Sequence, residues 1–410
     1  MKTASLLLFN VWFASSLILS FFVPPVFFYF GYGTSFALGL SLVCLYIVAG
    51  FFLSALLGRR YGLFIWSLGA SVLVTAGVLM HFTVAASFFD LDIFRALSSL
   101  ALLALMIFSA GILADFFLTL DNTTVNSAVI SMYVVMVCVV VVAGLGFGID
   151  GENATPKPVF PFAEPSHFSL SFIPFLLYVC TVHKTWLRLI GILTGVVIAV
   201  VLQNLTLFVG CFLVAMVVFR WHLLFAGLLA LIFVLFLLPL DYSYYIERVY
   251  FSSSSDNLSV LVFLQGWELA IEAIHHSLGW GIGFQQLGTI AADVPTAARI
   301  WELTQRSANL TDGGFVFSKL AAEFGLTGVL FSIGLVVILV GSFYKLKSIA
   351  ITCENESTHT IFAHCILLSY AIEFFVRGMG YFTPTTLFAI SSIYILARQH
   401  VDSTWRLQVV

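Results

Sequence analysis

The sequence predicts an all-α, polytopic membrane protein, with about twelve spans and one large polar loop late in the chain. Of the 410 residues, 61% are hydrophobic and 9% are charged, whereas soluble domains have about 25% charged residues. Apolar runs of roughly 20 residues recur along the chain, where a β-barrel would show alternating segments of about 10 residues. The net charge of −3 offers no basic surface, so nucleic acid is not an expected partner.

Apolar windows predict the spans in chain order: 5–30, 35–57, 62–82, 97–118, 127–148, 169–183, 188–202, 204–219, 222–240, 315–343, 359–377 and 381–397. The first window is too long for the apolar region of a signal peptide, so we expect it to remain as a span. The amides Gln203 and Asn204 interrupt a run that is too long for one crossing. We expect a tight turn between two short helices there.

Basic residues near the span ends predict the orientation, because cytoplasmic ends are enriched in lysine and arginine. With a cytoplasmic N-terminus, the inner ends carry most of the basic residues: Lys2, Arg59, Arg60, Lys184, Arg188, Arg220, Lys345, Lys347, Arg398 and Arg406. Both termini are therefore expected in the cytoplasm. A proline-rich loop at 149–168 and the long loop at 241–313 then lie outside. No internal repeat of the kind found in many transporters is visible.

The chain divides into an N-terminal bundle of about nine spans at 1–240, the loop at 241–313 and the C-terminal spans at 314–410. The loop holds eight of the 20 acidic residues of the chain, together with three arginines. The six cysteines show no disulfide or zinc spacing, and the loop shows no metal-ligand pattern. We therefore expect neither a metal nor another cofactor.

Residues 257–276 of the loop have a helical pattern, and Asp256 is the expected N-cap. One face of this helix is polar: Gln265, Glu268, Glu272 and His275. An adjacent stripe is apolar: Val260, Leu264, Trp267, Ile271 and Ile274. Such a helix is expected to lie against the membrane or the bundle. Its polar face is either simply solvated or turned toward a substrate.

Four glycines at 279–288 permit positive φ angles and a close backbone approach, either to a ligand or within a tight turn. Asp312, just before an apolar run, is expected as a helix N-cap, as an acid at the membrane–water boundary, or as both. Two pairs of ionisable residues lie four apart inside spans: Lys319 with Glu323, and Glu373 with Arg377. They either pair within their helices or line a polar cavity.

Four segments together resemble Wzy-type O-antigen or capsule repeat-unit polymerases, members of a superfamily that includes the O-antigen ligases. The segments are Asn257–Trp267, Leu278–Gly288, Asn309–Gly313 and Lys319–Gly325, so the resemblance covers roughly residues 240–330. It implies a bacterial inner-membrane glycosyltransferase of GT-C type. Such an enzyme transfers a glycan from undecaprenyl pyrophosphate to the next lipid-linked unit at the periplasmic face, without a nucleotide sugar or, by implication, a metal. A chain-length regulator and a flippase are the implied protein partners.

Ligases of this superfamily resemble one another in a His-Asn pair just before the span that follows the loop. The comparable stretch here, Ser307–Gly313, has no histidine, which favours a polymerase. Two alternatives stay open: an O-antigen ligase that transfers glycan to lipid A-core, and a flippase or permease for lipid-linked oligosaccharides.

Glycosyl transfer from a lipid pyrophosphate requires stabilisation of the departing phosphate charge and removal of a proton from the acceptor hydroxyl. Arginine suits the first task, because its planar fork pairs with phosphate oxygens. We expect Arg248 to bind the phosphate, with help from Arg299, Arg306 or Arg377. The candidate bases are Asp312 first, then Glu268 or Glu272. Further substrate contacts are expected from Gln265, Trp267, Gln285 and Asn309.

Overall fold

The computed structural model describes residues 2–56, 61–146, 149, 151–153, 159–222, 251–289, 294–305, 310–352, 354 and 356–408. Within these ranges it contains thirteen helices and, apart from one isolated bridge between Val159 and Phe162, no strand pairing. Nine of these helices are long and apolar enough to cross a membrane. The all-helical, multi-pass architecture is thereby confirmed.

The first eight helices follow the predicted spans closely: α1 (Lys2–Tyr29), α2 (Ala37–Leu56), α3 (Phe64–Ala85), α4 (Ile93–Thr119), α5 (Asn122–Gly144), α6 (Pro165–Val182), α7 (Thr185–Val201) and α8 (Leu205–Val218). The predicted turn between two short helices is confirmed at Gln203, which has a φ of 48°. Asn204 caps α8 by accepting a hydrogen bond from the Leu207 amide at 3.3 Å. Most of the span predicted at 222–240 lies outside the described residues.

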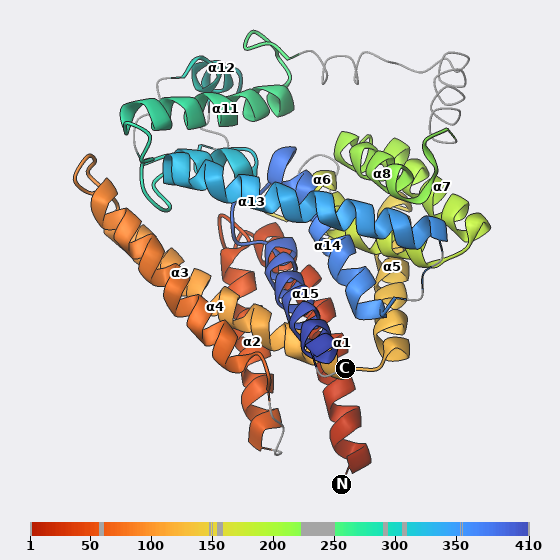
Figure 1. Cartoon of the computed structure of the whole chain (residues 1–410). Coiled ribbons are helices and arrows are strands. Elements are labelled where there is room, and N and C mark those ends of the chain that lie inside the picture. Colours follow the sequence, from red (N-terminus) through yellow and green to blue (C-terminus); the bar gives the residue numbers. More distant parts are fainter. Residues whose placement is uncertain are drawn as a thin grey trace, which may run out of the picture.

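The later helices are α11 (Leu258–His276), α12 (Pro295–Thr304), α13 (Val316–Thr352), α14 (Thr358–Phe375) and α15 (Pro384–Gln408). α11 lies beside α13 on the side of the molecule away from both termini, and α12 packs on it (Figure 1). With 19 residues, α11 is long and apolar enough to cross a membrane. The sequence had predicted it as a helix within the outer loop.

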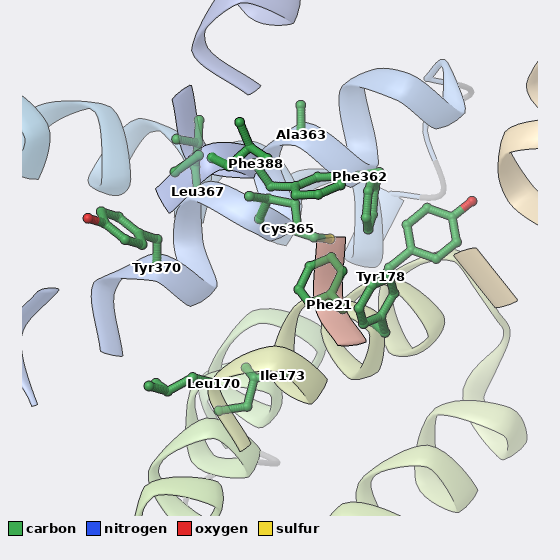
Figure 2. Close-up of a cluster of buried hydrophobic side chains, with 14 of the residues drawn as sticks. Phe21, Leu170, Ile173, Tyr178, Phe362, Ala363, Cys365, Leu367, Tyr370 and Phe388 are labelled. Atoms are coloured by element: carbon green, nitrogen blue, oxygen red, sulfur yellow. The ribbon is translucent and has the colours of Figure 1, made fainter. Parts of the chain in front are cut away.

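The core is centred on α6, which is buried along nearly its whole length. Phe21 of α1 contacts Phe175 of α6 and Phe388 of α15, with ring centroids 5.1 and 5.0 Å apart. The ring of Phe362 of α14 completes the group, with its centroid 5.8 Å from that of Phe175. Figure 2 shows Phe21, Phe362 and Phe388 in this cluster. Lipid is as apolar as these rings, so close packing rather than transfer from water holds the four helices together.

α13 is broken at Gly325, whose φ of 59° and ψ of −137° are not helical. A break of this kind frees backbone groups that need partners where water is excluded. The glycine-rich loop (residues 279–288) supplies them. The amides of Ile282 and Gly283 donate to the carbonyls of Ala322 and Glu323 at 3.0 and 2.9 Å, and the Leu326 amide donates to the Gly279 carbonyl at 2.8 Å.

The glycines of this loop therefore serve a close backbone approach to α13. Gly279, Gly281 and Gly283 have φ angles of 90°, 93° and 96°. A Cβ added to Gly281 would lie 2.5 Å from the Gly325 nitrogen. The sequence left two interpretations of these glycines open, a close approach to a ligand and a tight structural turn. The contacts agree with the tight turn.

The other side of the glycine-rich loop packs against α3 and the start of α4. The rings of His81 and Trp280 stack with centroids 5.1 Å apart, and the His81 Nε2 lies 2.9 Å from the Trp280 carbonyl oxygen. The Gln286 side chain accepts from the Asp92 amide at 2.8 Å and donates to the Asp92 carbonyl at 3.1 Å. The loop thus joins α3, α4 and α13.

The predicted N-cap of α11 is wrong. Its N-cap is Asn257, which accepts a hydrogen bond from the Ser259 amide, while Asp256 is exposed. The predicted apolar stripe is only partly packed on the protein, since Val260 is buried and Ile271 is 65% exposed. The side that packs on α13 carries small residues such as Gly266, where an added Cβ would lie 2.3 Å from a backbone carbonyl oxygen. Small residues let two helices approach closely in a membrane.

We expect Gly281→Ala to destabilise the protein by about 1–3 kcal/mol, because a positive φ and a backbone collision coincide there. Gly334→Ala is the matched control, since Gly334 is helical and nothing lies within 4 Å of an added Cβ. Thermal unfolding of the purified protein in detergent measures both. Equal melting temperatures for the two variants would contradict the role given to the loop.

Candidate functional site

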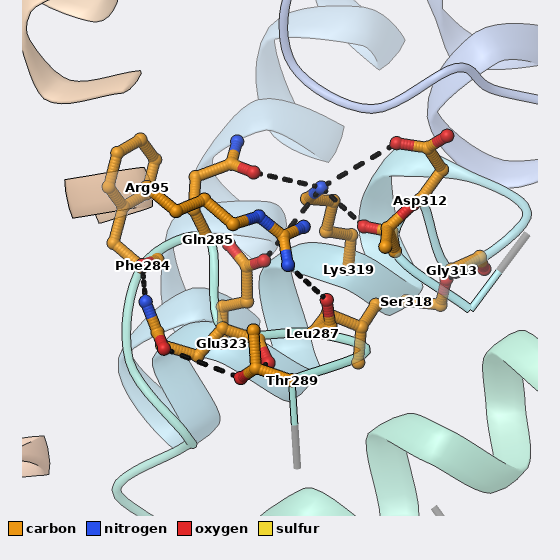
Figure 3. Close-up of polar contacts among 12 residues, drawn as sticks. Arg95, Phe284, Gln285, Leu287, Thr289, Asp312, Gly313, Ser318, Lys319 and Glu323 are labelled. Atoms are coloured by element: carbon orange, nitrogen blue, oxygen red, sulfur yellow. Dashed lines mark hydrogen bonds and ion pairs between the residues drawn. The ribbon is translucent and has the colours of Figure 1, made fainter. Parts of the chain in front are cut away.

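Lys319, in the first turn of α13, is the centre of a buried polar group, the Lys319 cluster (Asp312, Lys319, Glu323, Gln285 and Tyr381). Its side chain is 2% exposed. Its Nζ donates to the Thr311 carbonyl at 2.6 Å and to Gln285 Oε1 at 3.4 Å (Figure 3). It also lies 3.8 Å from an oxygen of each of two carboxylates, Asp312 and Glu323. Two acids and one base leave this cluster with a net negative charge when all three are ionised.

Glu323 is one helical turn further along α13 and is fully buried. The ion pair with Lys319 confirms the intrahelical pairing that the four-residue spacing allowed. The backbone of Gln285 and the hydroxyl of Tyr381 lie beside the Glu323 carboxylate. Burial, and then the Glu323 charge, raise the pKa of Tyr381 well above its ordinary value.

Asp312 lies on the solvent-exposed side of the cluster, and its side chain is 29% exposed. It was predicted as the N-cap of the helix that follows, but α13 begins only at Val316. Asp312 therefore precedes the first turn of α13, and it forms an ion pair with Lys319. Gly380 passes directly beside it, since a Cβ there would lie 3.1 Å from Asp312 Oδ1 and 3.6 Å from Lys319 Nζ.

A second polar group, the Arg377 cluster (Glu164, His167 and Arg377), lies nearby. Arg377 Nη2 is 3.0 Å from Glu164 Oε2, and His167 Nε2 is 3.7 Å from the same oxygen. The prediction that Arg377 could pair with Glu373 is wrong. The Glu373 carboxylate instead accepts a hydrogen bond from the Thr385 hydroxyl.

The arginine cavity, a hollow of about 570 Å³, opens beside this second cluster. It is lined by Glu164 and Arg377, by the amides Gln203 and Asn204, and by apolar residues of α8, α11 and α14 that include Phe263. Polar and apolar walls together suit an amphiphilic ligand. Among the described residues, Glu164 uses one of the five N–H donors of Arg377.

The two clusters meet where two glycine-containing segments cross. The Gly378 amide donates to the Gly314 carbonyl at 2.9 Å. Asp312 and Gly314 are two residues apart, as are Gly378 and Gly380. The carboxylate of Asp312 therefore lies close to both Lys319 and the border of the arginine cavity.

Three other residues that the sequence predicted as site residues make contacts within the protein. Glu268 accepts from the amide of Thr296 at 3.1 Å and from its hydroxyl, so it holds the start of α12. Glu272 pairs with His276 at 2.7 Å on the exposed side of α11. Trp267 packs against Phe315, with ring centroids 5.4 Å apart.

Arg299 is bound by two acids, Asp256 at 2.5 Å and Glu302 at 2.8 Å. These contacts raise its already high pKa and occupy the fork that was expected to bind phosphate. Gln265 is 1% exposed, and its amide has no hydrogen-bond partner among the described residues. The remaining candidates, Arg248, Arg306 and Asn309, lie outside the described residues.

Glu164, His167 and Tyr381 were not expected from the sequence as site residues. Glu164 and Arg377 are 213 positions apart, so no local spacing could join them. Glu164 does lie in the proline-rich loop that was expected outside the membrane, and in the structure that loop ends at Pro165, where α6 begins. Tyr381 is the first residue of the span predicted at 381–397 and carried no signal of its own.

The fold and these two clusters define a multi-pass helical membrane protein with an acid, a buried lysine and an arginine-lined cavity close together. Within the described residues, no group of three or more His, Cys, Asp or Glu side chains could hold a metal ion. No family model, no curated protein and no solved structure matches the chain.

The Glu164–Arg377 pair predicts a pH dependence of stability. Burial alone would raise the pKa of Glu164, but His167, Arg377 and the Ser166 hydroxyl together lower it to about 2. A carboxylate with a lowered pKa stabilises the fold above its ordinary value of 4.5, and this stabilisation is lost as the pH falls toward about 2.

We therefore expect Glu164→Gln to lower the melting temperature in detergent at pH 7 and to lower it progressively less below about pH 4.5. Glu354→Gln, which removes a partly exposed carboxylate paired with Lys345 elsewhere in the chain, is the control. A melting-temperature difference between wild type and Glu164→Gln that stays constant down to pH 3 would contradict the assignment.

Proposed function

We propose that this protein is a bacterial inner-membrane glycosyltransferase that polymerises lipid-linked oligosaccharide repeat units. The arginine cavity beside Asp312 is the observation that supports it most. Its mixed walls suit an amphiphile, and its arginine suits a pyrophosphate. The resemblance of residues 257–325 to Wzy-type polymerases points to the same chemistry. In this proposal the cavity faces the periplasm and both termini face the cytoplasm.

The donor in this mechanism is a glycan attached to undecaprenyl pyrophosphate. The acceptor hydroxyl oxygen forms a bond to the anomeric carbon of the donor, while the bond from that carbon to the pyrophosphate oxygen breaks. Arg377 stabilises the negative charge that develops on the departing pyrophosphate. Glu164 holds the guanidinium in the cavity wall before the donor binds.

Asp312 accepts the proton of the acceptor hydroxyl in the same mechanism. It is the exposed acid of the Lys319 cluster, so a bound sugar can reach it. Lys319 donates to the backbone just before Asp312 and thereby fixes the position of the carboxylate. The growing glycan then stays on the acceptor's carrier lipid, and undecaprenyl pyrophosphate leaves.

A flippase or permease is the second candidate, because a broken helix with buried charges is typical of transporters. α13 has both features, the break at Gly325 and the Lys319–Glu323 pair. In transporters, however, the freed backbone groups at such breaks bind substrate or ions. Here the glycine-rich loop occupies the carbonyls of Ala322 and Glu323. Because these backbone groups already have partners, the break favours a glycosyltransferase over a transporter.

We expect Arg377→Ala to lower polymer formation by about 10²–10³-fold, the cost of removing one donor that stabilises developing charge. Asp312→Asn should lower it by about 10²–10⁴-fold, as for loss of a general base. Arg220→Ala, an exposed arginine that does not line the cavity, is the control. Polymer ladders on gels, normalised to the amount of protein in the membrane, measure all three.

Normal long-chain polymer in both Arg377→Ala and Asp312→Asn would overturn the site. A deletion strain separates the candidate functions. A single repeat unit on the lipid A-core indicates a polymerase, whereas polymer that accumulates on carrier lipid, with none on the core, indicates a ligase. Lipid-linked units trapped in the cytoplasmic leaflet indicate a flippase.

A further inference from the structure

A second hollow, the lateral crevice, lies between the α3–α4 pair and helices α13, α14 and α15. Its volume is about 310 Å³. On its outer side it is bordered by Val74, Phe331 and Ile393, which are 39%, 65% and 39% exposed. On its inner side it ends at the buried Phe284 and Tyr381. The crevice therefore opens sideways, between helices that are expected to be surrounded by lipid.

The walls of the lateral crevice are almost wholly apolar. Among the residues that the structure describes, no charged side chain lines it, and its only polar side chains are the hydroxyls of two tyrosines and two threonines. A glycan or a pyrophosphate would lose its hydration there without gaining partners. A hydrocarbon chain fits these walls.

The inner end of the crevice is formed in part by Tyr381, a member of the Lys319 cluster. Tyr381 and Phe284 stack with centroids 5.9 Å apart, and both line the crevice. Lys319 Nζ lies 5.2 Å from the centroid of the Tyr381 ring. The Tyr381 hydroxyl is buried beside the Glu323 carboxylate. The crevice thus ends at the edge of the Lys319 cluster, so the polar head of a ligand whose tail lies in the crevice would reach this cluster.

The lateral crevice and the arginine cavity lie back to back. Phe374 lines the crevice and the next residue, Phe375, lines the arginine cavity. Val316 lines the first and Gly314 the second. Asp312 lies just before this shared border. Only the arginine cavity contains a cation that can stabilise a departing pyrophosphate.

We propose that the lateral crevice holds the isoprenoid tail of the acceptor, the second lipid-linked unit, while the donor occupies the arginine cavity. This assignment rests on the proposed polymerase function, because a polymerase must hold two lipid-linked molecules at once. The acceptor's pyrophosphate is not a leaving group, so it needs no arginine. Its sugar reaches Asp312 from the side opposite to the donor.

The test uses the purified full-length chain in phospholipid nanodiscs with an undecaprenyl phosphate that carries a photoreactive diazirine in its tail. Peptide mapping of wild type should find label on crevice residues and on residues of the arginine cavity. Ala389→Phe fills the crevice from α15, and Thr327→Trp narrows its exposed rim without altering a buried position. We expect either variant to lower crevice labelling by about tenfold, as for loss of most of the tail's burial.

Two control variants and a competition experiment test the specificity of this labelling. Ala101→Phe adds the same bulk at an exposed position of α4 that does not line the crevice, and it should leave the labelling unchanged. Arg377→Ala should lower labelling of the arginine cavity alone. Excess unlabelled undecaprenyl phosphate should compete for the crevice, and added phospholipid should not.

Polymer formation from lipid-linked units by the same samples separates the two proposals. Absence of crevice label, or label that phospholipid removes, overturns the acceptor site even if the wild type polymerises. Full polymer length in both crevice variants overturns it as well. Crevice label that is specific, in a wild-type protein that makes no polymer, overturns the proposed function and the acceptor role together.

Discussion

The break in α13 is the constraint on which the rest of the structure depends. A helix interrupted among other helices leaves amides and carbonyls that lipid cannot satisfy. Three backbone hydrogen bonds from the glycine-rich loop satisfy them. The loop can come this close only because Gly281 and Gly325 lack side chains. In holding the break, it also places Gln285 beside Lys319 and Phe284 beside Tyr381.

The spans were predictable because their signal is local: a run of apolar residues is as long as the membrane is thick. The helix at 258–276 was predictable for the same reason, from its periodicity. Its packed face was not, because the small side of α11 wins over the more apolar stripe only when α13 is present to fit against it. Propensity and hydropathy do not contain that information.

The site was predictable where partners are four residues apart and unpredictable where they are distant. Lys319 and Glu323 share a helix face, so their pairing follows from the spacing. The same spacing misled at Glu373 and Arg377, because Thr385 and Glu164 compete for them from other elements. Asp312 was found by its charge beside an apolar run, although its partner is a lysine and not a helix end.

The contacts of the glycine-rich loop with α3 and with the start of α4 have a mechanical consequence. His81 stacks on Trp280, and Gln286 is bonded twice to the backbone of Asp92. These contacts hold the two walls of the lateral crevice together near the start of α4. A long hydrocarbon chain that enters the crevice from the bilayer would therefore have to separate the walls at a point away from His81 and Gln286, and the loop that holds the break in α13 would stay in place.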